Sequence, residues 1–445
     1  MSVLESRNPL DQSLVGQVEY ASEAKVEVAV QLSQLAQQKW AKLSIQDRSA
    51  QVVNAYQQLS AVAEELALLI SLEMGKDRRR AGYEAQGTIH SAGYLVEEAA
   101  EAFRTEASGS RTQIQYRPLG VVAVISPWNY PLAMANNLII PALVASNSVI
   151  LKPSEHTPLV ADLFVKTLQK HLPENVIQVI HGEGDVGRSL VKSNINMVAF
   201  TGSVKAGRNI MATAAPELKR LVMELGGNDP MIVMDNADIK AAARFAVASS
   251  FENAGQMCTS TERVYVDHKI AGAFYREVVA TARMYQTGAW DLPGVNIGPL
   301  ANSSQHQKVV NQLLDAEQKG ANFLLGESHY EAPFIQPTVV TGMTPDMSLE
   351  SEETFGPVVA IAEYENLKEA VARANNSIYG LGAVVFGGQG AHEVAEQLEA
   401  GMVAVNQGVG GMGDSPWVGA KQSGFGFHGS KAGHRQFTQV RVMNY

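Results

Sequence analysis

The only cysteine of this 445-residue chain lies in a polar turn, where its thiol could act as a nucleophile. A helix-like run, 239–250, precedes the turn, and a strand-like run, 264–266, follows it. Free cysteine is among the most buried residue types, so an inert core thiol is the first alternative. Asn253 and Gly255 argue against it, because a polar, glycine-bearing turn is an unusual place for a core side chain. Cys258 is therefore a candidate nucleophile that needs partners.

Three other short motifs offer polar side chains that could act on this thiol. Asn129 stands in a turn between Pro127 and Pro131 and can donate from its amide, although a simple Asx turn is the alternative. Glu224 follows apolar residues, so burial would raise the pKa of its carboxyl; the alternative is a hinge carboxylate between domains. Glu353 precedes Thr-Phe-Gly-Pro, which is also compatible with a plain turn.

Two stretches at predicted strand ends have the properties of a phosphate cradle. Gly182 to Gly187 fits G-x-G-x-x-G, but no acidic residue follows about 20 positions later, as the dinucleotide fingerprint requires. Gly202 ends a buried strand and Ser203 begins a helix, whose free N–H groups and dipole suit a pyrophosphate. An ordinary serine N-cap is the alternative.

A third stretch contains a cation and a carboxylate that could bracket a ribose. Lys152 and Glu155 are three positions apart at the end of an apolar run, and a surface ion pair is the alternative. The carboxylate of Glu155 would repel a 2′-phosphate. This favours NAD as the cofactor, and NADP is the alternative.

The elements that would position these residues alternate between buried strands and helices. Strands without polar alternation are covered on both faces, which indicates a parallel sheet and a doubly wound α/β domain. The predicted strands are 121–125, 149–151, 176–180, 197–200 and 221–225. Helices are predicted at 21–43, 44–74, 133–144, 158–172, 186–193 and 204–214. A second α/β region follows Gly226, and the chain closes with a glycine-rich loop, 408–429, and a strand-like tail, 437–442, which could pair with another subunit.

The overall composition narrows the function classes. The formal net charge of −10 argues against nucleic acid as a partner. A single cysteine suits a reducing cytoplasm, and the amino terminus lacks the pattern of a secretory signal. No apolar stretch approaches the ~18 residues of a membrane span. The charge run Arg78 to Arg80 is most simply a solvated helix face.

Eight motifs in this order resemble the NAD(P)-dependent aldehyde dehydrogenase superfamily over nearly the whole chain. They are Pro127-Trp-Asn-Tyr-Pro131, Lys152-Pro-Ser-Glu155, Phe200-Thr-Gly-Ser203, Glu224-Leu-Gly-Gly227, Asn253-Ala-Gly-Gln-Met-Cys258, Glu353-Thr-Phe-Gly-Pro357, Asn376 with Tyr379-Gly-Leu381, and Lys421-Gln-Ser-Gly424. The resemblance implies an α/β fold with a Rossmann-type cofactor domain (1–110 and 119–225) and an α/β catalytic domain (226–425). It also implies a small β oligomerisation element (111–118 and 430–445) in a homodimer or homotetramer.

The resemblance also implies a role for each motif residue. Cys258 would attack the aldehyde, Asn129 would stabilise the oxyanion with Lys152 near that end, and Glu224 would activate water to release the acid. No metal is implied. The implied cofactor residues are Ser126, Pro127, Trp128, Lys152, Ser154, Glu155, Gly202, Ser203, Leu225, Glu353 and Phe355. The implied aldehyde tunnel is lined by Tyr130, Met134, Asn137, Met257 and Trp417.

This mostly apolar lining favours a medium-sized aliphatic or aromatic aldehyde. Members that act on succinic semialdehyde usually carry an arginine where this chain has Asn137, which counts against a dicarboxylic semialdehyde. An amino or betaine aldehyde stays open, since Tyr130 and Trp417 could form an aromatic cage. Glu224 favours thioester hydrolysis over transfer to CoA. A catalytically inactive binding protein is a further alternative, but Cys258, Asn129 and Glu224 are all present. A cysteine hydrolase is another, but it would need a histidine base, and no histidine lies near Cys258 in the sequence.

Two departures from the superfamily pattern are visible. One of the two glycines that usually precede the late lysine is missing in Trp417-Val-Gly-Ala-Lys421. The amino end is expected to lack a strand that longer members carry.

Overall fold

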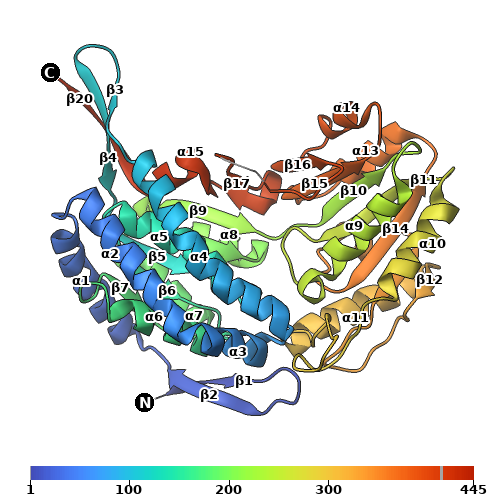
Figure 1. The fold of residues 1–445 in the computed structure, drawn as a ribbon, viewed down its shortest axis with the longest axis horizontal. Coiled ribbons are helices and arrows are strands. Elements are labelled where there is room, and N and C mark those ends of the chain that lie inside the picture. The colour runs from blue at the N-terminus through green and yellow to red at the C-terminus, as the bar shows by residue number, and fades with distance from the viewer. Residues whose placement is uncertain (1, 411–413) are drawn as a thin grey trace.

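The computed structural model describes residues 2–410 and 414–445, which form two α/β halves and a projecting sheet (Figure 1). A six-stranded sheet forms the core of the first half, and a seven-stranded sheet that of the second. Residues 411–413 of the predicted glycine-rich loop lie outside the described residues. Within the described residues, no helix combines the length and apolarity that crossing a membrane requires.

A hairpin and four helices precede the first sheet. They are β1 (Val3–Arg7), β2 (Leu14–Glu19), α1 (Glu23–Trp40), α2 (Ile45–Gln58), α3 (Ala63–Met74) and α4 (Arg78–Ala102). The predicted single helix 44–74 is wrong, because a 3₁₀ turn at Leu59–Val62 separates α2 from α3. Apolar spacing could not reveal this break, since Leu59 is still fully buried. The predicted ends are confirmed as caps: Ser44 caps the start of α2, and Gly75, whose φ of 80° suits glycine, caps the end of α3.

The first sheet contains all five predicted strands. They are β5 (Val121–Ile125), β6 (Ser148–Lys152), β7 (Ile177–Val179), β8 (Met197–Gly202) and β9 (Arg220–Leu225). Helices α5 (Ala133–Val144), α6 (Pro158–Gln169), α7 (Gly184–Lys192) and α8 (Val204–Ala214) connect them. The strand order is β18-β9-β8-β5-β6-β7, with the predicted strands parallel. The order reverses between β5 and β8, and a ligand cleft is expected at the carboxyl ends of strands there.

The second sheet has the order β12-β13-β14-β11-β10-β15-β16. Its strands are β10 (Asp229–Val233), β11 (Thr261–Asp267), β12 (Asn322–Leu325), β13 (Thr338–Thr341), β14 (Val358–Tyr364), β15 (Gly382–Phe386) and β16 (Met402–Val405). Its helices are α9 (Ile239–Phe251), α10 (Ala271–Ala282), α11 (Ser303–Gln318), α12 (Ser348–Ser351), α13 (Leu367–Asn375) and α14 (Ala391–Ala395). The sequence predicts strands here at 231–234, 264–266, 337–341, 384–386 and 402–406, but none at the positions of β12 and β14.

The end of the chain returns to the first half. The elements are β17 (Trp417–Val418), β18 (Gly424–Phe425), β19 (Phe427–His428), α15 (Ser430–Arg435) and β20 (Thr438–Asn444). β18 joins the edge of the first sheet beside β9. β20 pairs with β4 (Thr112–Pro118), which also pairs with β3 (Glu106–Ala107), and this sheet projects from the body at the upper left of Figure 1.

Candidate active site

The turn that carries Cys258 is built from three consecutive residues in the left-handed conformation. After α9 ends at Phe251, the φ angles are 52° at Asn253, 57° at Ala254 and 75° at Gly255. A Cβ on Gly255 would lie 2.1 Å from the Gly356 carbonyl carbon, so a side chain does not fit there. Non-glycine residues in this conformation are costly and cluster at functional sites. The half-buried Cys258 follows directly.

Hydrogen bonds tie this turn to Asn129, which comes from the other half of the molecule. Asn253 donates from Nδ2 to the main-chain oxygens of Asn129 (3.1 Å) and Gln256 (3.2 Å). Asn129 donates from its own Nδ2 to Gln256 O at 3.1 Å, which uses one of the two amide protons. Within the described residues, the Cys258 N–H donates to no protein atom. The second amide proton and this N–H are two donors beside the thiol.

A cavity of about 220 Å³ brings the thiol together with these partners. Its lining comes from the segment after β5, the start of α5, the ends of β8 and β9, the Cys258 turn, helix α11 and the loop after α12. The lining residues are Pro127, Trp128, Asn129, Met134, Thr201, Gly202, Ser203, Glu224, Leu225, Gly226, Cys258, Gln305, Lys308, Glu353 and Phe355.

The cavity disfavours charge on both of its titratable reacting groups. Burial raises the pKa of Glu224 to about 7, an effect that hydrogen bonds from Cys258 and Trp417 oppose. Burial, followed by the charge of Glu224, raises the pKa of the Cys258 thiol well above its usual value. The thiol therefore carries its proton at neutral pH, while Glu224 is poised to exchange one.

The loop with Glu353 and Phe355 is held by a carboxylate that sequence analysis missed. Glu262 on β11 accepts hydrogen bonds from the N–H groups of Thr354 and Phe355, both at 2.8 Å. Burial, then the nearby charge of Glu353, raises the pKa of Glu262 to about 8. The Phe355 ring contacts the Trp128 ring edge-on, with centroids 5.6 Å apart. In the sequence, Glu262 lies between Thr261 and Arg263, just before the predicted strand 264–266, so no local signal marked it as buried.

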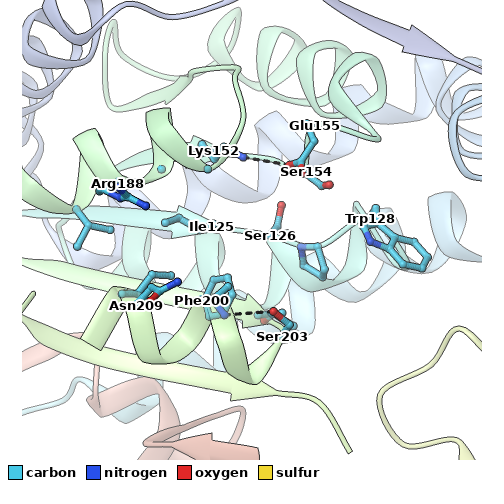
Figure 2. A pocket seen from close by; sticks show the side chains of 18 of the residues that line it. Ile125, Ser126, Trp128, Lys152, Ser154, Glu155, Arg188, Phe200, Ser203 and Asn209 are labelled. Carbon is cyan, nitrogen blue, oxygen red and sulfur yellow. Dashed lines mark hydrogen bonds and ion pairs between the residues drawn. The ribbon is translucent and has the colours of Figure 1, made fainter. Parts of the chain in front are cut away.

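A second cavity, of about 370 Å³, adjoins the first and shares Pro127, Trp128 and 201–203 with it. Figure 2 shows Lys152 and Glu155 on one side of this cavity and Ser203 on the other. Lys152 Nζ lies 3.6 Å from Glu155 Oε2. Ser203 caps α8 by accepting from Ala206 N at 3.2 Å. This cavity lies at the sheet's reversal point, beside the N-terminus of α8, which is where a dinucleotide binds in such sheets.

The predicted site residues divide among these cavities and a third one. Ser126, Ser154 and Lys152 line the dinucleotide cavity, and Lys152 is not in the lining of the Cys258 cavity. The remaining predicted cofactor residues line one or both: Pro127, Trp128, Glu155, Gly202, Ser203, Leu225, Glu353 and Phe355. Of the predicted tunnel residues, Met134 lines the Cys258 cavity, whereas Tyr130 and Asn137 line a groove with Arg80 and Glu252. Met257 is half-buried, and Trp417 contacts Glu224.

A buried ion pair beneath Asn129 was also missed. Lys76 and Glu84 are in contact with side chains 0% and 2% exposed. Lys76 Nζ donates to Asn129 O at 2.8 Å and lies 3.7 Å from the centre of the Tyr130 ring. Glu84 accepts from Leu132 N at 3.0 Å. Only the fold brings these residues to Asn129, so no local sequence signal could have shown the contact.

The prediction that Arg78 to Arg80 form a solvated helix face is wrong for Arg80. The Arg80 side chain is 13% exposed and pairs with Asp77 (2.9 Å) and Glu252 (2.8 Å). A run of consecutive charges in the sequence does not reveal ion-pair partners, such as Glu252, that come from distant parts of the chain.

These features together define a class of protein: an α/β dinucleotide-binding oxidoreductase with a cysteine beside a buried carboxyl and two N–H donors. Residues 2–443 match the Aldehyde dehydrogenase family, and the chain belongs to this family. It is an NAD(P)-dependent aldehyde dehydrogenase.

Individual relatives cover the chain almost completely. A Sinorhizobium fredii protein, named as a probable succinate-semialdehyde dehydrogenase, NADP(+), is 35% identical over 98% of this chain and 91% of its own length. The crystal structure of an aldehyde dehydrogenase from Brucella melitensis biovar abortus has a TM-score of 0.95 at 33% identity, covering 100% of this chain and 94% of that one. An NAD-dependent aldehyde dehydrogenase from Sinorhizobium meliloti has a TM-score of 0.95 at 30% identity, covering 100% and 91%.

Proposed function

We propose that this enzyme oxidises a medium-sized, uncharged aldehyde to a carboxylic acid through a covalent intermediate on Cys258. The observation that carries the proposal is the single cavity that Cys258, Glu224 and Asn129 line beside the dinucleotide cavity. A thiol, a proton acceptor and oxyanion donors are the groups that this chemistry needs.

The proposed roles follow from the geometry. Cys258 Sγ bonds to the carbonyl carbon as the C=O π bond opens, and the thiol proton passes to solvent water in the same step, because the raised pKa keeps the thiol protonated until it attacks. The second amide proton of Asn129 and the Cys258 N–H hold the oxyanion. When bound, the dinucleotide supplies the hydride acceptor. Glu224 then takes a proton from water as the water oxygen bonds to the acyl carbon, the C–S bond breaks and the acid is released.

The proposed dinucleotide site uses the chain's own charges. Lys152 and Glu155 hold a ribose at one side of the cavity, while Gly202 and Ser203 hold phosphate at the start of α8. Glu155 lines this cavity as a carboxylate, since its pKa is lowered. Its charge disfavours a 2′-phosphate, and we propose a preference for NAD over NADP.

The groove beside Tyr130 supports an uncharged substrate. Lys76 occupies a face of the Tyr130 ring, so this face is not free to hold a cationic aldehyde. Arg80 in the same groove is already paired with two carboxylates. A semialdehyde is the second candidate, because the groove contains this guanidinium and the Sinorhizobium fredii relative bears a semialdehyde name.

The assembly and the domain division are proposals as well. Val440 and Val442 are 49% and 59% exposed on β20 at the edge of the projecting sheet. We propose that this edge joins subunits in a homodimer or homotetramer. The three sheets support the predicted cofactor, catalytic and oligomerisation domains, and β18 returns from the catalytic segment to the cofactor sheet.

The test is a screen of reduced-cofactor formation with aliphatic, aromatic, amino and dicarboxylic semialdehydes, each with NAD and with NADP. Aliphatic or aromatic aldehydes should give the highest kcat/KM, and a clear preference for a semialdehyde would select the second candidate. Cys258→Ala should form no reduced cofactor. Glu224→Gln should keep a pre-steady-state burst but turn over slowly, and acceleration of the wild-type enzyme by CoA would contradict hydrolysis.

A further inference from the structure

One indole N–H contacts the carboxylate of Glu224. Trp417 Nε1 lies 3.3 Å from Glu224 Oε1. No other protein N–H reaches this carboxylate within residues 2–410 and 414–445. Glu224 Oε2 is buried and has no hydrogen-bond partner among the same residues. The two oxygens of the carboxylate are therefore not equivalent: one is held and one is left for another proton donor.

The Trp417 ring is itself held in place. In the short antiparallel pair β17–β19, Trp417 lies opposite His428. The two rings are stacked, with centroids 6.4 Å apart and planes 18° apart. His428 is buried, which lowers its pKa to about 4, so an uncharged ring supports the indole at neutral pH.

The same segment is fixed to the strand that carries Glu224. Gly424 on β18 pairs with Glu224 on β9, and Ser423 Oγ donates to Gly226 O at 2.7 Å. Residues 417–428 therefore hold the main chain around Glu224 at two points and its carboxylate at a third. A side chain that only lined an aldehyde tunnel would not need this hydrogen bond.

We infer that Trp417 is a positioning residue, whose indole N–H holds Glu224 Oε1 so that Oε2 takes the proton of the hydrolytic water. The inference deepens the proposed function and rests on Glu224 as the base. In the step concerned, the water O–H bond breaks, its proton passes to Oε2, and the oxygen bonds to the acyl carbon.

The charged surroundings of Glu224 set the expected pH dependence. Cys258 faces it from the turn after α9, and Glu353, 3.8 Å from Lys308, faces it from the loop after α12. After burial, the charge of Glu353 raises the pKa of Glu224, whereas the nearby Cys258 thiol and the indole N–H of Trp417 lower it. Removing the indole N–H should therefore raise this pKa and reduce the ionised fraction at pH 7.

The experiment is Trp417→Phe, which keeps an aromatic ring and removes the N–H. We expect kcat for hydrolysis to fall about 10-fold, as for the loss of a hydrogen bond to a charged group. The acidic limb of the kcat–pH profile should move upward by about one unit, and the aldehyde KM should fall together with kcat. The burst and kcat/KM should stay unchanged, because they report steps before hydrolysis. Trp290→Phe is the matched control, because its buried Nε1 has no partner within the described residues and it lines none of the three cavities.

A double-mutant comparison separates the inference from the function on which it rests. In a Glu224→Gln background, Trp417→Phe should cause no further loss of turnover, since both changes act on one step. An equal loss in both backgrounds, or a change confined to KM, would overturn the inference and favour a tunnel wall. If Glu224→Gln alone does not slow turnover, the proposed role of Glu224 fails instead.

Thermal unfolding and NAD binding are measured as controls that each variant is folded. Should Trp417→Phe fail to fold, His428→Leu leaves the N–H but removes the ring behind it. This variant should move the same pH limb in the same direction by a smaller amount, and an unchanged profile would overturn the inference.

Discussion

Replacing Lys76 by Met should destabilise the protein and slow catalysis together. The change leaves Glu84 charged and 2% exposed without its cation, although Leu132 N still donates to it. Removing one partner of a buried pair costs about 3–5 kcal/mol, since the remaining charge stays buried. Asn129 O also loses the 2.8 Å donor that fixes it, so its amide should hold the oxyanion less well.

The assay is urea unfolding, monitored by tryptophan fluorescence at a fixed protein concentration. The kcat of the same samples is measured as well. Lys76→Met/Glu84→Gln is the matched control. It removes both charges and keeps an oxygen for Leu132 N, so it should recover most of the lost stability but not the activity. A single variant that costs less than about 1 kcal/mol, or a double variant no more stable than the single one, would refute this reasoning.

Four further outcomes are expected. Gly255→Ala should fold with a displaced Cys258 turn and lose most aldehyde oxidation, because its Cβ would meet Gly356 at 2.1 Å; near-normal kcat would contradict this. Glu155→Gln should tighten NADP binding relative to NAD in a fluorescence titration, and an unchanged ratio of the two Kd values would count against the charge argument. Because the pKa of Glu224 is raised to about 7, wild-type thioester hydrolysis should slow as pH falls through 7, whereas a flat profile from pH 6 to 8 would exclude it as the base. Val440→Lys with Val442→Lys should shift the mass measured by light scattering toward the monomer, and an unaltered mass would place the interface elsewhere.

The fold was largely predictable because its parallel strands carry a strong local signal. The run Val121–Ile125 is apolar and buried at every position, as a strand covered on both faces must be. The missed strand β14 is buried at six of its seven positions but directly follows the turn-like motif at Glu353 to Pro357. The break at Leu59 was invisible for a different reason: a 3₁₀ turn keeps the apolar residues near the same face of the helix.

The site was predictable where a residue's role depends on a motif, and less so where it depends on a contact. Asn129, Glu224 and Cys258 do line one cavity. Lys76 and Glu262 support that cavity from elements far away in the chain, and no spacing rule connects them to it. Trp417 was expected in the aldehyde tunnel by alignment, whereas its indole N–H reaches the carboxylate of Glu224. The motif placed Trp417 near the site, but it could not show in which direction the indole N–H points.

The position of the thiol relative to its oxyanion donors depends on main-chain oxygens that both halves of the molecule share. Asn129 O accepts from Lys76 of the first half and from Asn253 of the second, while Gln256 O accepts from Asn129 and Asn253. Two of these bonds, from Asn253 to Asn129 O and from Asn129 to Gln256 O, cross between the halves at the point where the carbonyl would react. A shift of one half would therefore break the oxyanion site before it opened the dinucleotide cavity, whose lining comes from the first half alone. It follows that variants at Asn253 should impair acylation while leaving NAD affinity unchanged, and weaker NAD binding would show that the two halves are coupled more broadly.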